Sequence, residues 1–246
     1  MPIRAVIFDL GGTLMEWPEW MERAPEKWRA SYSYLVAARP GKWPNETEFV
    51  AAMRAAELEH WRLVDEAQAS TTPLGLVREG FRRLAIEPTE DAALAVLDGY
   101  AASATGWAEV YPTSATTLLA LRGAKYRLGL LSNTWWAAAW HDADLAAHGL
   151  GDLFDVVVYT SDLPRSKPHP SAFRHVARRL DVAPEECVMI GDRLIDDVGG
   201  ALGVGMRGIW RRNATTPTRD DIDPTAVIEG VEEVPAILRR WADLSG

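Results

Sequence analysis

The sequence predicts an α/β fold: a parallel β-sheet covered by helices on both faces, with an inserted bundle of four helices. From Val110 onward, short apolar runs alternate with helical segments of roughly ten residues, a pattern typical of parallel βαβ units. A first apolar run, Ala5 to Phe8, stands alone before a long helical stretch that contains no strand pattern. We therefore expect a core of residues 1–16 and 107–246 and a helical cap of residues 17–106.

The first strand and the cap helices follow from local signals. Ala5 to Phe8 is a continuous run with β-branched and aromatic residues, which indicates a buried strand. In the cap, Asn45 with Glu48 has the form of a capping box, and Thr72 before Pro73 has the form of an N-cap followed by proline. The expected cap helices span residues 18–39, 45–69, 72–84 and 88–103.

The core elements alternate regularly after the cap. Apolar runs predict strands, and the segments between them carry apolar residues at helical spacing. Because parallel strands end at the same edge of a sheet, the cap should sit over that edge as a lid. The expected strands are 126–132, 154–159, 187–190, 206–210 and 226–228, and the expected helices are 113–122, 135–148, 170–180, 195–202 and 231–244.

Composition excludes several function classes. The chain of 246 residues is 48% hydrophobic, which is ample for a buried core. Its net charge is −9 and no basic run exceeds a pair of arginines, so we expect no nucleic-acid partner. No apolar run reaches about 18 residues, so we expect no membrane partner. The strand that starts near residue 3 leaves no room for a signal peptide, and Cys187 is the only cysteine. We expect a cytoplasmic monomer or homodimer.

Tryptophan is unusually frequent. The chain has 11 tryptophans, and five of them lie in its first quarter: Trp17, Trp20, Trp28, Trp43 and Trp61. Such residues most often pack helices together, and the alternative is that some of them line a pocket.

The first strand ends at a carboxylate. Asp9 follows Phe8 and precedes two glycines, so it should lie at the carboxyl end of a buried strand. In an open α/β sheet ligands bind beyond these ends, where a carboxylate can act as a nucleophile or hold a cation. The simpler alternative is an aspartate that caps a turn.

Polar residues follow other apolar runs in the same way. Ser132-Asn133 ends one strand, Gly191-Asp192 ends another with Asp196-Asp197 just beyond, and Ser166-Lys167-Pro168 lies in the loop after a third. Each could be a turn, a cap or a solvated loop residue. Their joint placement at one edge of a sheet indicates a functional site.

Four motifs of this sequence resemble those of the haloacid dehalogenase-like superfamily, in the branch with a helical cap inserted after the first motif. The first motif is Asp9-Leu10-Gly11-Gly12-Thr13, the second is Ser132, the third is Lys167, and the fourth is Gly191-Asp192 with Asp197. The resemblance covers essentially the whole chain. It implies a Rossmann-like core in which Asp9 attacks a phosphoryl group.

The same resemblance implies a ligand set. Mg²⁺ would be held by Asp9, the Gly11 carbonyl and Asp192, while Ser132 would donate to a phosphoryl oxygen and Lys167 would counter negative charge. Asp197 would orient Lys167 or a metal-bound water. The remaining substrate-binding residues that we assign are Gly12, Thr13, Asn133 and Glu16. These assignments make chemical sense, because a phosphate dianion repels a carboxylate unless a hard cation and a lysine bring them together.

One position departs from similar phosphatases. They carry a second aspartate two residues after the nucleophile as general acid and base, and this chain has Gly11. Such a group contributes about 10²–10⁴ in rate, so hydrolysis should be slow unless Glu16 substitutes as the acid.

Three functions are compatible with these residues. The leading hypothesis is a Mg²⁺-dependent phosphohydrolase of a small phosphorylated metabolite that acts through an aspartyl-phosphate. Gly11 motivates an alternative, a catalytically weak or silent relative that binds a ligand or partner through its cap. Haloacid dehalogenation, which needs no metal, is a third hypothesis that the acidic cluster of Asp192 and Asp197 speaks against.

Overall fold

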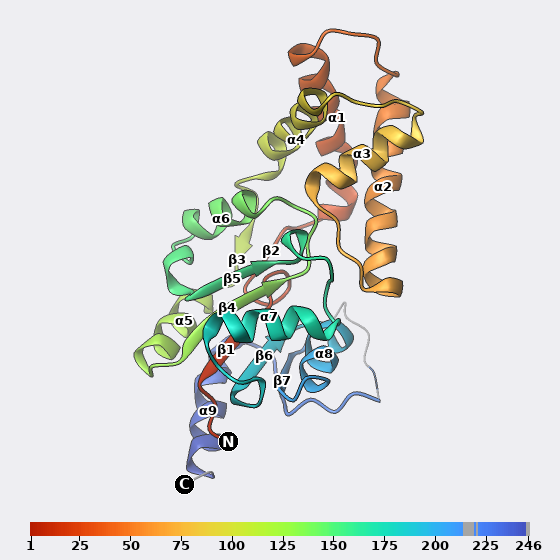
Figure 1. The fold of residues 1–246 in the computed structure, drawn as a ribbon. Helices are drawn as coiled ribbons and strands as arrows, with labels where there is room; N and C mark the ends of the chain where they lie inside the picture. The colour runs from red at the N-terminus through yellow and green to blue at the C-terminus, as the bar shows by residue number, and fades with distance from the viewer. Residues whose placement is uncertain (214–218, 220, 245–246) are drawn as a thin grey trace.

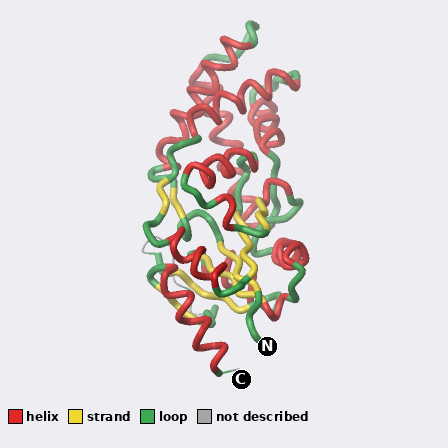
Figure 2. The backbone as a smooth tube through the Cα atoms, turned by 90° about the vertical axis from the view of Figure 1, so that its left-hand side faces the viewer, coloured by secondary structure: helices red, strands yellow, loops and turns green. Residues whose placement is uncertain are grey.

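The architecture is a helical bundle above a sheet sandwiched between helices. A computed structural model describes residues 1–213, 219 and 221–244. Figure 1 shows four helices, α1 to α4, standing above one end of the sheet, with both termini at the opposite end of the molecule, and Figure 2 shows the same division from the side. The predicted α/β fold class with a Rossmann-like parallel sheet and a helical cap is confirmed.

Within the described part of the chain, the main sheet has six parallel strands in the order β5-β4-β1-β6-β7-β8. Its first strand, β1, therefore lies in the interior between β4 and β6, where both of its edges are hydrogen-bonded. Phe8 is in register with Leu130 on one side and Ile190 on the other, so the residues that follow these three come out side by side. The strands are β1 (Ala5–Phe8), β4 (Arg127–Ser132), β5 (Val156–Tyr159), β6 (Cys187–Gly191), β7 (Arg207–Arg211) and β8 (Ala226–Ile228).

Helices cover both faces of this sheet. Val6 and Phe8 point into one apolar cluster and Ala5 and Ile7 into another, as the alternation of a strand requires. The first cluster is completed by α5 (Ser114–Gly123), α6 (Ala138–Ala147) and α9 (Val234–Asp243), and the second by α7 (Pro170–Leu180) and α8 (Gly200–Leu202).

The four upper helices have a separate apolar core built around Trp28, Phe49, Phe81 and Tyr100. The predicted N-cap bonds are present: Asn45 Oδ1 accepts a hydrogen bond from the Glu48 amide at 2.9 Å, and Thr72 Oγ1 accepts one from the Gly75 amide at 3.0 Å. The helices are α1 (Trp20–Ala38), α2 (Glu46–Ala67), α3 (Pro73–Arg83) and α4 (Glu90–Ala104).

A short antiparallel ribbon joins the two parts. It consists of β2 (Met15–Glu16) and β3 (Glu109–Val110), where the chain leaves the sheet and returns to it. Strands of two residues carry no readable pattern, so the sequence did not predict them. The ribbon lies close to the expected boundaries at residues 16 and 107, and the division into core and cap at these points stays our proposal.

Three predicted core helices differ in the structure. The helix expected over 135–148 begins only at Ala138, because Thr134 Oγ1 accepts a hydrogen bond from the Trp136 amide at 2.9 Å and holds this segment as a loop. The helix expected over 195–202 is a π-helical segment, Leu194–Gly199, that continues into α8. The closing helix begins with a 3₁₀ turn, Val231–Glu233, before α9.

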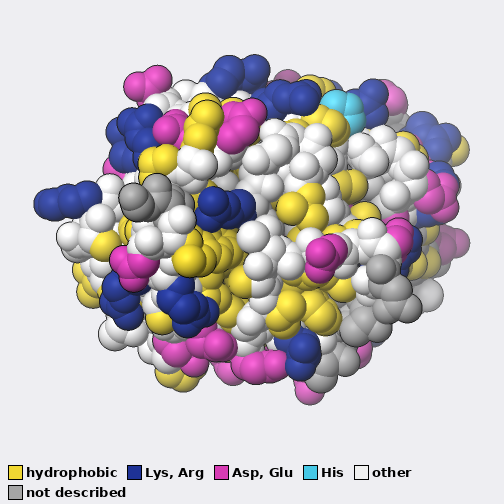
Figure 3. All heavy atoms as spheres, turned by 90° about the horizontal axis from the view of Figure 1, so that it is seen from below, with side chains coloured by type: hydrophobic (Ala, Val, Ile, Leu, Met, Phe, Trp, Pro, Cys, Tyr) yellow, Lys and Arg dark blue, Asp and Glu magenta, His cyan; other side chains and the backbone are white. Residues whose placement is uncertain are grey.

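The surface away from the cap is mixed in character. Viewed from below, Lys and Arg side chains are interspersed with Asp, Glu and hydrophobic side chains (Figure 3). Among the described residues, no helix has the length and apolar character needed to cross a bilayer.

Candidate active site

Lys167 is held by three hydrogen bonds at the sheet edge. Its side chain is buried, and its ammonium group donates three hydrogen bonds: to Asp9 Oδ1 at 2.6 Å, to Asp197 Oδ1 at 2.6 Å and to the Leu131 carbonyl at 2.8 Å. An ammonium group has three donors, so all of them are used. The lysine is thereby fixed against the carboxylate that ends β1.

Asp9 directly follows β1, and its amide donates to the Ile190 carbonyl of β6 at 2.9 Å. Burial raises the pKa of its carboxyl group to about 7; Lys167 opposes this rise, while the charges of Asp197 and Asp192 add to it. A further positive charge near Asp9 would favour the ionised form of its carboxyl group.

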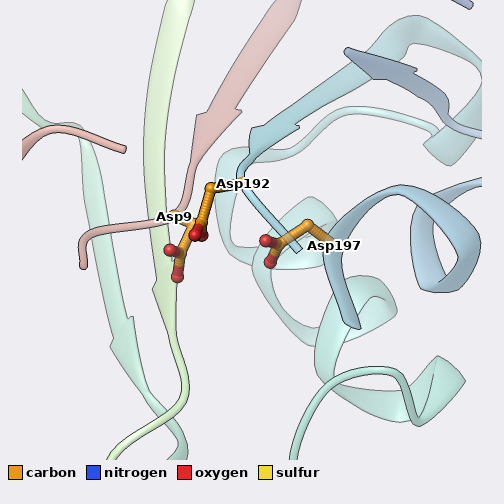
Figure 4. Close-up of side chains that lie close together, drawn as sticks. All are labelled: Asp9, Asp192 and Asp197. Carbon is orange, nitrogen blue, oxygen red and sulfur yellow. The ribbon is translucent and has the colours of Figure 1, made fainter. Parts of the chain in front are cut away.

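Three buried carboxylates converge at this edge. Asp9, Asp192 and Asp197 each offer an oxygen atom, and these atoms lie within 4.8 Å of one another. Figure 4 shows Asp9 and Asp192 close together beyond the ends of β1 and β6, with Asp197 reaching toward them from the segment after β6. Asp197 accepts from Lys167 Nζ with one oxygen and from the Arg193 amide with the other, at 3.0 Å, so both of its oxygens hold the protein together.

Two glycines make this convergence sterically feasible. A Cβ at Gly12, whose φ is +74°, would lie 2.6 Å from Asp192 Oδ2, and a Cβ at Gly191 would lie 2.2 Å from Asp197 Cγ. Any side chain at either position would push a carboxylate out of place.

The donor set fits a hard divalent cation. Asp9, Asp192 and Gly11 line the same cavity, and carboxylate and carbonyl oxygens are the ligands that Mg²⁺ prefers. The raised pKa of Asp9 also fits, since a nearby cation would offset the repulsion between the carboxylates. A Mg²⁺ ion could therefore be held here.

The cavity has a volume of about 720 Å³ and lies between the sheet edge and the cap. Asp9, Ser132, Lys167 and Asp192 line its polar end. Its apolar wall includes three partly exposed tryptophans, Trp17, Trp20 and Trp61. Part of the tryptophan-rich segment thus lines a pocket, while Trp28 packs the cap core.

The residues assigned to substrate binding have different surroundings. Gly12, Glu16 and Asn133 line the cavity. The Asn133 amide group accepts from the Lys167 amide at 2.9 Å and donates to the Lys167 carbonyl at 3.0 Å, so in this structure it brackets the lysine backbone. Glu16 is exposed, and its Oε2 accepts from the Tyr111 hydroxyl at 2.9 Å.

Thr13 lies away from the cavity. It is fully buried and is not among the residues that line the cavity, and its assignment to substrate binding stays a prediction. The reason for its burial is the turn after Asp9, in which the amides of Thr13 and Leu14 both donate to the Leu10 carbonyl and the Thr13 side chain faces the interior.

Sequence reasoning missed His141 on α6. It lines the cavity, its Nε2 lies 2.9 Å from Thr134 Oγ1, and its ring stacks on Trp136 with centroids 5.1 Å apart. Burial lowers its pKa to about 3, so the ring is neutral at ordinary pH. A single histidine in a helix has no spacing signal that could have identified it.

Known proteins resemble this chain in sequence. A family model described as haloacid dehalogenase-like hydrolase matches residues 3–205. The glyceraldehyde 3-phosphate phosphatase of Methanopyrus kandleri is 30% identical over 165 residues, which are 65% of this chain and 70% of that protein. The phosphoglycolate phosphatase of Nitrosococcus oceani is 31% identical over 163 residues, 63% of this chain and 71% of that protein.

Similar solved structures carry the names of two different activities. A HAD phosphatase from Thermococcus onnurineus is 26% identical with a TM-score of 0.64, over 96% of this chain and 98% of that one. A 2-haloacid dehalogenase from Pseudomonas syringae pv. Tomato DC3000 is 25% identical with a TM-score of 0.70, over 97% of this chain and 99% of that one.

Proposed function

Because the chain belongs to the haloacid dehalogenase-like hydrolase family, we propose that it is a Mg²⁺-dependent phosphohydrolase acting on a small phosphorylated metabolite through an aspartyl-phosphate. The observation that carries this proposal is the contact of Lys167 Nζ with Asp9 Oδ1 at 2.6 Å, beside Asp192 at the polar end of the cavity. The names of two relatives, glyceraldehyde 3-phosphate phosphatase and phosphoglycolate phosphatase, support the same activity.

The chain's own residues divide the reaction between them. The Asp9 carboxylate attacks phosphorus, the bond to the ester oxygen breaks, and the leaving alkoxide takes up a proton from water. Water then attacks the phosphorus of the aspartyl-phosphate, which releases phosphate and restores Asp9. Lys167, held by Asp197, balances the charge on nucleophile and phosphate, and Ser132 donates to a phosphoryl oxygen.

A Mg²⁺ ion held by Asp9, Asp192 and the Gly11 carbonyl would supply the positive charge that lets a phosphate dianion approach a carboxylate. The cap would exclude water from this reaction and select the substrate.

Two other functions stay open to test. Haloacid dehalogenation is favoured by the 25% identity to a dehalogenase and by Gly11, but it does not use a metal-binding carboxylate such as Asp192. A weak or silent ligand-binding relative is favoured by Gly11 alone.

The test uses the intact protein with p-nitrophenyl phosphate. We expect turnover that requires Mg²⁺, is lost with EDTA and is abolished by Asp9→Asn, because an amide cannot replace the anionic nucleophile. Asp152→Asn, at an exposed position, serves as the matched control. Metal-independent release of halide from 2-chloropropionate would favour the dehalogenase, and no turnover of either compound would favour the silent relative.

A further inference from the structure

Partly exposed indoles form the apolar wall of the cavity. Trp17 follows β2, Trp20 begins α1 and Trp61 lies on α2, so three separate segments bring them together. A volume of about 720 Å³ is far more than a phosphate group fills, and it falls in the range of pockets that enclose drug-sized molecules. This wall can therefore contact the organic part of a phosphate ester.

The indoles are arranged edge to face. Trp20 and Trp61 have ring centroids 5.7 Å apart at an interplanar angle of 62°, and Trp17 meets Trp136 at 5.7 Å and 73°. Trp61 Nε1 is buried without a hydrogen-bond partner among the described residues. An aromatic ring that packs edge to face or offset against an indole gains attraction beyond what its buried apolar area provides. An aromatic group of a substrate could gain the same attraction from these indoles.

The charges around the cavity are strongly unequal. Its lining includes two cationic side chains: Lys167, which pairs with Asp9 and Asp197, and Arg193, which pairs with Asp196 at 2.8 Å. Among the described lining residues there is no further lysine or arginine.

Three more carboxylates line the same cavity. Glu16, Glu19 and Asp65 are exposed and line the cavity. A second anionic group on a substrate would meet these charges without a cation to offset them.

We propose that the substrate is a phosphate monoester whose organic part is aromatic and carries no negative charge. This specificity rests on the proposed phosphatase function and narrows it. It separates the chain from the relative named phosphoglycolate phosphatase, because phosphoglycolate carries a carboxylate next to its phosphate ester.

Four primary alkyl phosphates test the proposal on the Mg²⁺-loaded protein: propyl, 3-phenylpropyl, 3-cyclohexylpropyl and 3-(4-carboxyphenyl)propyl phosphate. Their leaving groups are nearly equal in acidity, so the glycine at position 11 affects all four alike. We expect kcat/KM for the phenylpropyl ester to exceed that of propyl phosphate by about tenfold to a hundredfold. The kcat/KM of the phenylpropyl ester should also exceed that of the cyclohexyl ester by about threefold and that of the carboxylated ester by about tenfold.

Variants with matched controls locate the effect. Trp61→Leu should lower the ratio of phenylpropyl to propyl kcat/KM by about fivefold. Trp43 lies elsewhere in the cap, where its indole nitrogen donates to the Arg39 carbonyl. Trp43→Leu should therefore leave that ratio unchanged. Asp65→Asn should reduce the difference in kcat/KM between the phenylpropyl and carboxylated esters. Asp98 is exposed on α4, and Asp98→Asn should leave this difference unchanged.

The outcomes separate the two proposals. Hydrolysis of p-nitrophenyl phosphate together with equal kcat/KM for all four esters, or with preference for the carboxylated one, overturns the specificity and leaves the phosphatase intact. Equal values for the phenyl and cyclohexyl esters overturn its aromatic part. If no phosphate ester is hydrolysed, including p-nitrophenyl phosphate, the proposed function fails and the specificity falls with it.

Discussion

The indole nitrogen of Trp17 donates a hydrogen bond to Asp144 Oδ2 at 3.0 Å. The other oxygen of Asp144 accepts from the Gly106 amide at 3.0 Å. Trp17 and Gly106 lie at the two ends of the inserted helical segment, while Asp144 is a buried residue of α6 in the core. A single carboxylate thus holds both crossings between core and cap.

Replacing this carboxylate should destabilise the protein. Asp144→Ala removes the charged acceptor of two partly buried hydrogen bonds, and a hydrogen bond to a charged group contributes about 1.5–3 kcal/mol. We expect the free energy of unfolding to fall by about 2–4 kcal/mol and hydrogen exchange to accelerate at Gly106. Urea unfolding and exchange mass spectrometry measure both effects. Asp152→Ala, on the surface, is the control, and equal exchange in the two variants would contradict the role of Asp144.

Trp135 makes a third connection. It follows the core strand β4 but belongs to the cap's apolar cluster, where its ring stacks on Trp28 with centroids 5.7 Å apart at 12° and meets Tyr100 at 4.9 Å. Any motion of the cap relative to the sheet must therefore carry this loop along or break these contacts.

Trp135→Ala should cost about 3–5 kcal/mol of unfolding free energy, because it opens a large cavity in a fully buried position. Trp135→Phe keeps an aromatic ring and should lose less unfolding free energy. Trp20→Ala, at a partly exposed indole on the cavity wall, is the control and should be milder. Chemical denaturation of the three variants measures how much unfolding free energy each one loses. A small loss for Trp135→Ala would show that the loop is not anchored in the cap.

Stability should fall with acidity through buried histidines. Burial lowers the pKa of His141 to about 3 and that of His60 to about 4, whereas in the unfolded chain they protonate near 6.5. Below pH 6.5 the unfolded state thus binds more protons than the folded state, and each histidine removes about 1.4 kcal/mol of stability per pH unit until its folded-state pKa is reached.

The variant His141→Gln tests this pH dependence. We measure the free energy of unfolding against pH between about pH 6 and 4.5. The slope for His141→Gln should be shallower than that of the parent protein by about 1.4 kcal/mol per pH unit, which corresponds to one proton. His60→Gln should act alike, and the double variant should lose both contributions. A parent-like slope in His141→Gln would mean that the ring is protonated in the folded state.

Much of the fold could be predicted because its signals are local. The Asn45 and Thr72 caps and the apolar runs that end at Asp9, Ser132 and Gly191 are each readable within a few residues. The meeting of the strand ends at one edge then follows from parallel pairing.

The packing between core and cap could not be predicted. The contacts of Asp144 with the two crossings and of Trp135 with Trp28 join residues far apart in sequence, and neither has a periodic or motif signature. The burial of Thr13 could not be predicted either, because a motif position says nothing about which way a turn directs its side chain.

The last prediction concerns Gly11. A Cβ there would lie 3.6 Å from Cζ3 of Trp17, which is an ordinary contact, so an aspartate can be accommodated beside the indole. If a missing general acid limits the rate, aryl phosphates should react much faster than alkyl phosphates in the parent protein. Gly11→Asp should then raise alkyl turnover by up to about 10²–10⁴.

Glu16 offers the competing explanation. It lines the cavity, and its carboxylate is held by the Tyr111 hydroxyl at 2.9 Å, which it would have to leave to protonate an alkoxide. If Glu16 is the acid, Glu16→Gln should slow alkyl turnover selectively and Gly11→Asp should add little. If Gly11 leaves the site without an acid, Glu16→Gln should change little. Gly11→Asn controls for side-chain bulk, and unchanged aryl-to-alkyl ratios in all three variants would show that leaving-group protonation is not rate-limiting.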